Sequence, residues 1–440
     1  MTLLSLPSGA RQLGVLACSA LLVAGFAGCS APSDTAPVAR TSPQPAPNAV
    51  SSWTLALEQL PSPASAASST PQLTVEGERT ILSWLDVADF PTPLKFAERT
   101  SSGWSEPRVV ASGEDFVVNA ADVPSVRALS DGTLAAHWLV EDPPDPEAYK
   151  LPLSFSKDGG RTWSRPTYPN HDRTKTQHGF ASLFQAPGAG LGVVWLDGRA
   201  TNPTAPEGAN GAMNLWGAVY DRDGKQISET AIDTRVCDCC QLSTAATSEG
   251  VIVAYRDRSA DEIRDIYVTR LVDGHWSAPT PVHADGWKIE GCPINGPAVD
   301  ARGRDVAVAW FTAATGEGQA FAAFSQDGGR TFGPAIRVDD AASKGQVDIE
   351  LLADGSAAVS WVEFSNERSR FSVRRIEPGG ARSPAVAIAD VSGGYPRLAQ
   401  SRGELLFAWT ETDGRASTRV RTARASLGAL SDKSTPPASR

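Results

Sequence analysis

The chain has 440 residues, is 41% hydrophobic and carries a formal net charge of −10. The length allows a large core, and 39 Gly and 32 Pro indicate an all-β chain with many turns rather than a helical one. The negative charge argues against the phosphate backbone of nucleic acid as a partner.

The first 28 residues are predicted to be a targeting segment and not part of the fold. Arg11 precedes an apolar run that ends in Phe26-Ala27-Gly28-Cys29. The run is too short for a spanning helix, and its end resembles a lipobox, in which small residues precede a cysteine that becomes lipid-modified after cleavage. The resemblance implies a lipoprotein signal peptide over residues 1–28 and a lipid on Cys29. The alternative is an ordinary signal peptide that is cut nearby.

Residues 29–50 are rich in Ser, Ala, Pro and Thr, and residues 429–440 have a similar composition. Segments of this kind cannot form a core. We therefore expect a flexible tether, a folded region over residues 51–428 and a disordered tail. Serine after Cys29 favours the outer membrane, facing the periplasm, by the sorting rule of Gram-negative lipoproteins.

An apolar strand that ends in an aromatic residue recurs roughly every 50 to 60 residues. The seven aromatic residues are Trp84, Trp138, Trp195, Tyr255, Trp310, Trp361 and Trp409. Another strand precedes each of them, and two more follow in most units. Four short strands per unit are typical of a propeller blade, whose apolar faces require stacking against neighbouring blades.

The repeat predicts an all-β fold, a seven-bladed β-propeller. The last unit has only three strands, whereas an additional strand, residues 53–57, precedes the first unit. We expect this N-terminal strand to complete the last blade, which closes the ring and removes an exposed sheet edge. We also expect a monomer.

Two turns between third and fourth strands carry a known motif. Residues 156–163 read Ser-Lys-Asp-Gly-Gly-Arg-Thr-Trp, and residues 325–332 read Ser-Gln-Asp-Gly-Gly-Arg-Thr-Phe. Asp and Gly favour a tight turn, because Gly adopts a positive φ and Asp bonds the turn backbone. Both turns resemble the Asp box, the bacterial neuraminidase repeat of the sialidase superfamily. The resemblance implies structural roles for Ser156, Asp158, Gly160, Trp163, Ser325, Asp327, Gly329 and Phe332.

The resemblance also implies an alternative fold and an activity. Sialidases have six blades and are exo-glycosidases that hold a substrate carboxylate with three arginines and attack with a tyrosine paired with an acid. Tyr395 and Glu363 are the candidates for that catalytic pair. The chain lacks the family's Phe/Tyr-Arg-Ile-Pro motif, because its first unit reads Thr70-Pro71-Gln72-Leu73.

In a propeller, the segments that lead into the first strands share one face around the channel mouth. His178 lies in the segment before blade 3, Cys237, Cys239 and Cys240 lie before blade 4, and Cys292 lies before blade 5. An oxidising compartment and an even number of cysteines favour two disulfides, with Cys292 bonded to one of the other three. The alternatives are a soft-metal site for Cu or Zn with thiolate and imidazole ligands, or one disulfide beside two reactive thiols.

Charged residues at the same mouth are candidate ligand contacts, because arginines hold anions through forked hydrogen bonds. The candidates are Asp197, Arg199, Arg256, Arg258, Gln346, Asp348 and Arg397. We therefore expect a cell-envelope lipoprotein that binds a ligand, either carbohydrate or an envelope protein, at a Cys-lined channel mouth. The alternatives are an exo-glycosidase of the sialidase type and a protein-interaction scaffold.

Overall fold

The computed structural model describes residues 53–428, except 146, 187, 189, 202–210, 366, 392 and 413–416. The chain forms two compact units, Met1–Ala46 and Pro47–Arg440, and every described residue belongs to the second. The predicted signal peptide, Cys29, the tether and the tail at 429–440 lie outside the described residues. Among the described residues, no helix is long and apolar enough to cross a membrane.

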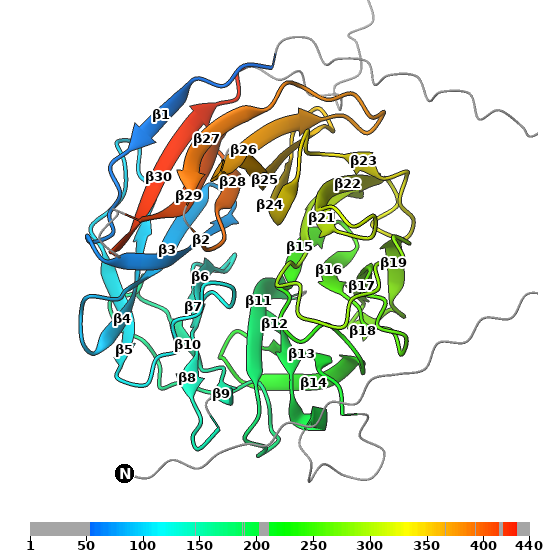
Figure 1. Ribbon diagram of the computed structural model, residues 1–440. Coiled ribbons are helices and arrows are strands. Elements are labelled where there is room, and N and C mark those ends of the chain that lie inside the picture. The colour runs from blue at the N-terminus through cyan, green and yellow to red at the C-terminus, as the bar shows by residue number, and fades with distance from the viewer. Residues whose placement is uncertain are drawn as a thin grey trace, which may run out of the picture. The chain divides into compact units, whose positions relative to one another are not determined.

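Seven antiparallel sheets form the blades of a β-propeller (Figure 1). The predicted seven-bladed propeller is therefore confirmed, and the six-bladed alternative is wrong. Blade 1 contains β2 (Ser68–Glu76), β3 (Arg79–Asp86), β4 (Thr92–Glu98) and β5 (Arg108–Gly113). Blade 2 contains β6 (Ser125–Ala128), β7 (Leu134–His137) and β10 (Leu153–Ser156). Blade 3 contains β11 (His178–Ala186), β12 (Gly190–Asp197), β13 (Asn214–Tyr220) and β14 (Gln226–Asp233). Blade 2 also carries the hairpin of β8 (Val140–Glu141) and β9 (Tyr149–Lys150), and blade 3 the short 3-10 helix η1 (Arg199–Thr201).

The remaining blades follow in chain order. Their strands are β15 (Ser243–Thr247), β16 (Gly250–Arg256), β17 (Ile266–Val272), β18 (His275–Trp276) and β19 (Thr280–His283) in blade 4, β20 (Ala298–Arg302), β21 (Asp305–Thr312), β22 (Gln319–Ser325) and β23 (Ile336–Arg337) in blade 5, β24 (Ser343–Leu351), β25 (Ala357–Ser365), β26 (Arg368–Ile376) and β27 (Val386–Val391) in blade 6, and β28 (Arg397–Ser401), β29 (Glu404–Thr412), β30 (Thr418–Ser426) and β1 (Leu57–Leu60) in blade 7.

The innermost strands of the blades form a closed ring. Each contacts the innermost strand of the next blade, and β28 of blade 7 contacts β2 of blade 1. The predicted N-terminal strand completes blade 7, since β1 pairs with β30 in a register that places Leu57 opposite Ala425. The strand begins at residue 57, four residues after the expected start at residue 53. This pairing covers the outer edge of β30, which would otherwise expose unpaired backbone groups.

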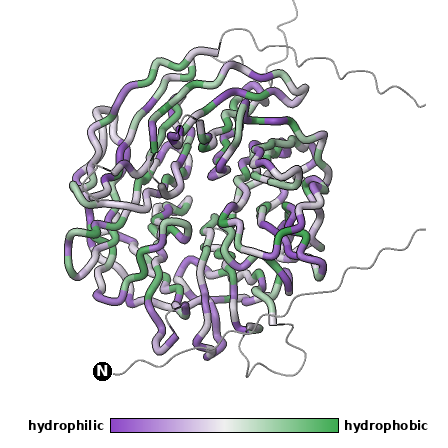
Figure 2. Tube along the Cα trace, viewed as in Figure 1, coloured by the Kyte–Doolittle hydropathy of each residue, from purple (hydrophilic) through white to green (hydrophobic). Residues whose placement is uncertain are grey.

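The hydrophobic core is divided into interfaces between adjacent blades. Seven buried clusters each consist mainly of residues of two neighbouring blades. The seven aromatic residues of the repeat are all buried, and each contributes to the cluster shared with the preceding blade. Both faces of every sheet are thus covered by neighbours, and polar and apolar stretches are interspersed around the ring (Figure 2). The repeated aromatic residue is a packing feature.

Many of these buried indoles also need a hydrogen-bond acceptor. Trp84 donates to Asp86 over 3.0 Å, Trp195 to Asp197 over 2.7 Å and Trp361 to Glu363 over 3.1 Å. In each pair the acid follows the tryptophan by two residues. Asp197 and Glu363, which sequence reasoning placed in a binding or catalytic site, therefore serve the core.

The turns at 156–163 and 325–332 share one set of hydrogen bonds. The hydroxyl of Ser156 accepts from the amide of Gly160 over 2.8 Å, and that of Ser325 accepts from Gly329 over 3.0 Å. Asp158 accepts from the amides of Arg161 and Thr162, and Asp327 makes the corresponding pair with Arg330 and Thr331. These bonds hold the pKa of both carboxyls well below the ordinary value, although desolvation opposes the shift.

Glycine is required at one position of each turn for two reasons. Gly160 and Gly329 have φ of +82° and +79°, and a Cβ on them would overlap Phe96 of blade 1 and Ile252 of blade 4. The closing aromatic residues pack against the same neighbours' clusters, since Trp163 meets Phe96 edge-on and Phe332 contacts the core between blades 4 and 5. Each turn thus secures its own blade to the preceding one.

Candidate functional site

The inner strands line a cavity of about 500 Å³ along the propeller axis. Register places one residue of each inner strand opposite the residue that precedes the repeated aromatic. These seven equivalent residues are Gln72, Ser125, Ser182, Ser243, Ala298, Asp348 and Arg397. All of them line the cavity, which we call the channel cavity. Its wall is therefore rich in hydroxyl, amide and charged groups.

Acids of the wall bond the next blade. The innermost strand of a blade is an edge of its sheet, so the backbone amides on its unpaired side need hydrogen-bond acceptors from elsewhere. Asp348 accepts from the amide of Leu398 over 2.9 Å, and Asp300 accepts from Leu351 over 2.7 Å. Glu350 accepts similarly from the backbone of Gln400. These carboxylates join blades 5, 6 and 7 around the channel, and this gives Asp348 a structural role.

Burial of this acidic wall raises the pKa of its carboxyls. The pKa of Asp300 rises to about 6, that of Asp348 is raised, and that of Glu350 lies well above its ordinary value because burial is reinforced by the charges of Asp300 and Asp348. A buried acid of this kind accommodates a proton near neutral pH. Because protonated acids carry no charge, this side of the channel repels an anionic ligand less than three ionised carboxylates would.

Three hydrogen bonds at one end of the cavity join segments that lead into different blades, and two of them link blades that are not adjacent. The amide of Gln241, before blade 4, donates to the carbonyl of Ala121, before blade 2, over 2.8 Å and accepts from the amide of Gly296, before blade 5, over 2.9 Å. The phenol of Tyr395, before blade 7, donates to the carbonyl of Ile294. We call these five residues the mouth bridge.

The mouth bridge closes the face where sequence reasoning placed the ligand. Tyr395 is buried, as are Thr70 and Phe180 at the equivalent level of blades 1 and 3. At the opposite end of the inner strands, Arg302 and Gly77 are exposed. Solvent therefore reaches the channel cavity mainly from the side of the turns between first and second strands.

Backbone strain is concentrated at the level of the mouth bridge. Thr70, Phe180 and Gln346 occupy equivalent positions two residues before the wall residues Gln72, Ser182 and Asp348, and their φ values lie between +51° and +54°. Each sits in a β-bulge of its inner strand. A left-handed backbone costs on the order of 1 kcal/mol or more for such residues and is common near functional sites.

Asp122 and Tyr149 form a buried pair that sequence reasoning missed. The phenol of Tyr149 on β9 donates to Oδ2 of Asp122 over 2.9 Å, whereas Oδ1 of Asp122 has no partner among the described residues. Burial raises the pKa of Asp122 to about 7. Asp122 lines the channel cavity, and Gly179 is needed beside the pair because a Cβ there would overlap both side chains.

Arg397 is the one predicted arginine that reaches the channel cavity. No hydrogen bond or ion pair connects its guanidinium to another described residue, and its Nε is buried without a partner. Its carbon Cζ lies 5.8 Å from the ring centre of Tyr395. Burial lowers the pKa of Arg397, although the charge of Asp348 opposes the shift.

Arg256 is a buried structural cation. Its Nε, Nη1 and Nη2 donate to the carbonyls of Asn295, Arg264 and Phe311 at 2.9, 2.5 and 2.7 Å. The guanidinium also stacks on Trp287, 4.9 Å from the ring centre. Each of its three nitrogens donates to a carbonyl and the residue is only 1% exposed, so Arg256 is not accessible to a ligand.

Arg199 and His178 belong to an ionic cluster on blade 3, in which both are bonded to acidic residues of the protein. Arg199 forms a fork with Asp197, binds Glu229 over 2.8 Å and lies 3.6 Å above the ring of Trp216. His178 contacts Asp172 over 3.2 Å and the carbonyl of Thr176 over 3.0 Å. Burial alone would lower the pKa of His178, but the bond to Asp172 and the charge of Asp197 outweigh it and raise the pKa.

The remaining predicted residues have separate partners. Arg258 forms ion pairs with Glu262 and Asp238, and the backbone amide of Gln346 donates to Asn295 over 2.8 Å. Tyr395 bonds Ile294, whereas Glu363 bonds Trp361, so they are not paired as nucleophile and acid. The four predicted arginines do not converge on one point. Arg199 and Arg258 are bonded to carboxylates and Arg256 is bonded to carbonyls of the protein itself.

The four cysteines within the described residues form two disulfides, Cys237–Cys240 and Cys239–Cys292. The predicted staple between the segments before blades 4 and 5 is confirmed. It joins the two segments that supply Gln241, Ile294 and Gly296 to the mouth bridge. His178 does not join the sulfur atoms, since it groups with Asp172 and Asp197, while Cys237, Cys239 and Cys240 form a separate group.

Solved structures with a similar propeller include an ulvan lyase of a new polysaccharide lyase family, bound to -[GlcA(1-4)Rha3S]-. It is 12% identical, covers 83% of this chain and 95% of its own, and gives a TM-score of 0.54. The likeness is one of fold. A protein of unknown function from Dyadobacter fermentans is 14% identical over 84% of this chain and 98% of its own, with a TM-score of 0.50. No family model matches the chain, and no curated protein is similar to it in sequence.

Proposed function

We propose that the protein is an exported lipoprotein, held on the outer membrane by a lipid on Cys29, whose monomeric Asp-box propeller binds an anionic carbohydrate in the channel cavity. The observation that carries the binding proposal is Arg397, a cavity-lining guanidinium without a hydrogen-bond acceptor among the described residues. A buried cation that lacks a protein partner is stabilised by an anionic ligand. A uronate carboxylate is the chemistry that fits it.

The rest of the cavity wall supports a carbohydrate. Gln72, Ser182, Ser243 and Thr244 offer hydroxyl and amide groups of the kind that pair with sugar hydroxyls. A volume of about 500 Å³ lies within the range of small-molecule sites. The ulvan lyase of similar fold was solved with an anionic saccharide. In this proposal the Cys239–Cys292 staple and the mouth bridge hold the closed end of the pocket rigid.

Calorimetric titration of the purified protein with a uronate-containing oligosaccharide tests the binding proposal. We expect Arg397→Ala to weaken binding about 10-fold or more, because a charge-assisted hydrogen bond contributes ~1.5–3 kcal/mol, and Arg397→Lys to weaken it less. The matched control is Arg258→Ala, whose ion pairs lie outside the cavity. Equal affinity of the native protein and Arg397→Ala, or no binding of any uronate, would remove the proposal.

The anchor is tested separately in cells. Labelled palmitate should be incorporated into the native chain, and Cys29→Ala should abolish both the labelling and sedimentation with membranes. Labelling that persists in Cys29→Ala would contradict the lipid site. This result would leave the carbohydrate proposal untouched, because the two depend on different residues.

A second candidate function, a carbohydrate-cleaving enzyme, is favoured by the pair of Asp122 and Tyr149. An acid whose pKa is about 7 can both give and take a proton at neutral pH. Tyr395 is a poor nucleophile by contrast, because burial raises its pKa to about 12. Turnover of an arylated sialoside or a uronate polymer that is lost in Asp122→Asn would support an enzyme; no turnover by the native protein would exclude it.

A further inference from the structure

The two disulfides differ in their access to solvent. Cys237 and Cys240 are buried, with exposed fractions of 0% and 1%, whereas Cys292 is exposed and Cys239 is partly exposed. Attack by an external thiolate requires access to a disulfide sulfur. The Cys239–Cys292 bond is therefore the place where a reductant can react.

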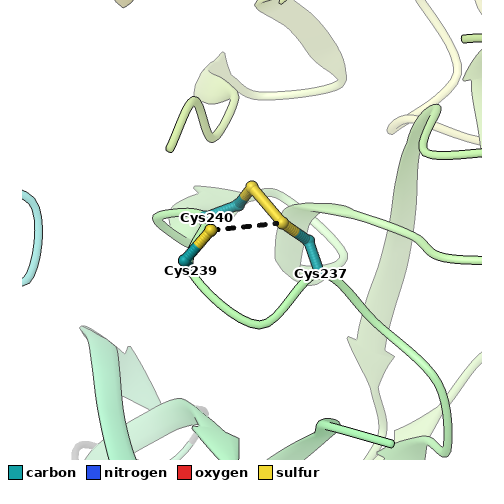
Figure 3. Close-up of side chains that lie close together, drawn as sticks. All are labelled: Cys237, Cys239 and Cys240. Atoms are coloured by element: carbon teal, nitrogen blue, oxygen red, sulfur yellow. Dashed lines mark hydrogen bonds between the residues drawn. A yellow bond between two sulfur atoms is a disulfide. The ribbon is translucent and has the colours of Figure 1, made fainter. Parts of the chain in front are cut away.

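The buried disulfide lies beside the exposed one. The Sγ atoms of Cys237 and Cys239 are 4.0 Å apart, and the sulfur atoms of Cys237, Cys239 and Cys240 all lie within 4.8 Å of one another (Figure 3). This is close to the contact distance of two sulfur atoms. A thiolate released at Cys239 would thus face the Cys237–Cys240 bond without a change of fold.

A buried cation adjoins the same sulfur. Nη1 of Arg264 lies 3.7 Å from Sγ of Cys237, and Nε of Arg264 has no partner among the described residues. During thiol–disulfide exchange the negative charge is shared among the attacking, central and leaving sulfur atoms, and a neighbouring guanidinium stabilises it. In an attack on Cys237 that atom is the central sulfur, so Arg264 stabilises the share of the charge that lies on it.

We propose that the four cysteines form a thiol–disulfide relay that is reduced by an exported dithiol partner. A thiolate of the partner attacks Cys292, a mixed disulfide forms, and Cys239 leaves as a thiolate. Cys239 then attacks Cys237, a Cys237–Cys239 bond forms, and Cys240 leaves as a thiolate that takes up a proton. The partner's second thiol resolves the mixed disulfide and frees Cys292. One dithiol is oxidised, and the protein gains two electrons and two protons.

The relay predicts which thiols appear after a two-electron reduction. The purified protein is treated anaerobically with one equivalent of dithiothreitol, quenched in acid, alkylated and mapped by mass spectrometry. We expect alkylation of Cys240 and Cys292 together with a Cys237–Cys239 disulfide. Alkylation of Cys239 and Cys292 would show simple reduction of the exposed bond and would overturn the relay, and so would the absence of any reaction.

A double variant tests the point of attack. In Cys239→Ala/Cys292→Ala the buried disulfide remains but its exposed neighbour is gone. We expect dithiothreitol to reduce Cys237–Cys240 about 10-fold or more slowly than in the native protein. An equal rate would contradict the relay. Isolation of the native protein with four free thiols and one equivalent of Cu(I) or Zn(II) would also overturn it and would assign the cluster to a soft metal.

Discussion

The phenol of Tyr395 in blade 7 donates a hydrogen bond to the carbonyl oxygen of Ile294, which leads into blade 5. Blade 6 lies between the two in the ring, so the bond crosses the mouth of the channel instead of following its rim. Together with the contacts of Gln241 it closes the face on which sequence reasoning placed the ligand. Binding in the channel cavity therefore depends on the opposite face or on opening of this bond.

Tyr395→Phe should loosen the mouth bridge. The variant keeps the ring and removes one hydrogen bond, so we expect a loss of ~1 kcal/mol in the free energy of unfolding and faster amide hydrogen exchange over residues 294–296. Tyr220→Phe is the control, because it removes a comparable phenol bond to Gln226 within blade 3. Unchanged exchange over residues 294–296 would show that the bridge does not depend on Tyr395.

Asp122 should make stability depend on pH. Its folded pKa of about 7 lies above the ordinary value of 3.8, so between these values the folded state binds more protons than the unfolded state. The free energy of unfolding should therefore fall as pH rises from about 4 to 7, by on the order of 3–4 kcal/mol for this group. Asp122→Asn keeps one carbonyl oxygen as acceptor for the Tyr149 phenol and carries no charge, so it should be more stable than the native protein at pH 8 but not at pH 4. Urea denaturation at both pH values measures the difference, and a constant difference would contradict the assignment.

The two motif turns should contribute similarly to stability. Ser325→Ala removes the acceptor for the buried amide of Gly329, which should cost ~1–2 kcal/mol. Ser156→Ala makes the same change in blade 2 and should cost about as much. Thermal unfolding of the two single variants and the double variant provides the check. Because the turns lie in different blades, their effects should add, and strong coupling would contradict independent roles.

Arg256 should tolerate no conservative replacement. Lysine keeps the charge but cannot reach three carbonyls at once, so Arg256→Lys should lose ~2–4 kcal/mol in the free energy of unfolding. Arg258→Lys, at a partly exposed ion pair, should lose less than ~1 kcal/mol. Chemical denaturation of both variants gives the comparison, and a neutral Arg256→Lys would reopen the question of a ligand role for this residue.

Removal of β1 should open the ring. In a chain that begins at residue 61, β30 would present an unpaired edge, and the interface of blades 6 and 7 would lose its contact with Trp53. We expect association in size-exclusion chromatography and a lower melting temperature than for a chain that begins at Trp53. A monomeric, equally stable product would show that blade 7 closes without β1.

The architecture could be predicted because its signal is repeated seven times. Each second strand ends in an aromatic residue that fills the interface with the preceding blade, so one packing requirement recurs in the sequence at regular spacing. The two complete turn motifs added a second periodic signal. The Trp-x-acid pattern of Trp84, Trp195 and Trp361 was equally visible and would have assigned Asp197 and Glu363 to the core.

The site was less predictable because its contacts are not periodic. Arg199 and Arg256 lie at comparable places near the ends of second strands, yet Arg199 binds Glu229 on the outer strand β14 and Arg256 binds the carbonyl of Asn295 before blade 5. Tyr149 lies on a hairpin that only blade 2 has among the described blades, so nothing in the repeat pointed to its contact with Asp122. The disulfide staple was predictable, but the choice of Cys239 as the partner of Cys292 depends on side-chain direction in a loop.

The register of Leu57 opposite Ala425 also constrains how the protein is made. A chain synthesised from its N-terminus delivers β1 first and its partner β30 last. Until β30 is made, β1 remains a solitary strand, and a chain that is terminated before residue 418 has no place for it. Closure of the ring is therefore the last event that synthesis of the propeller permits.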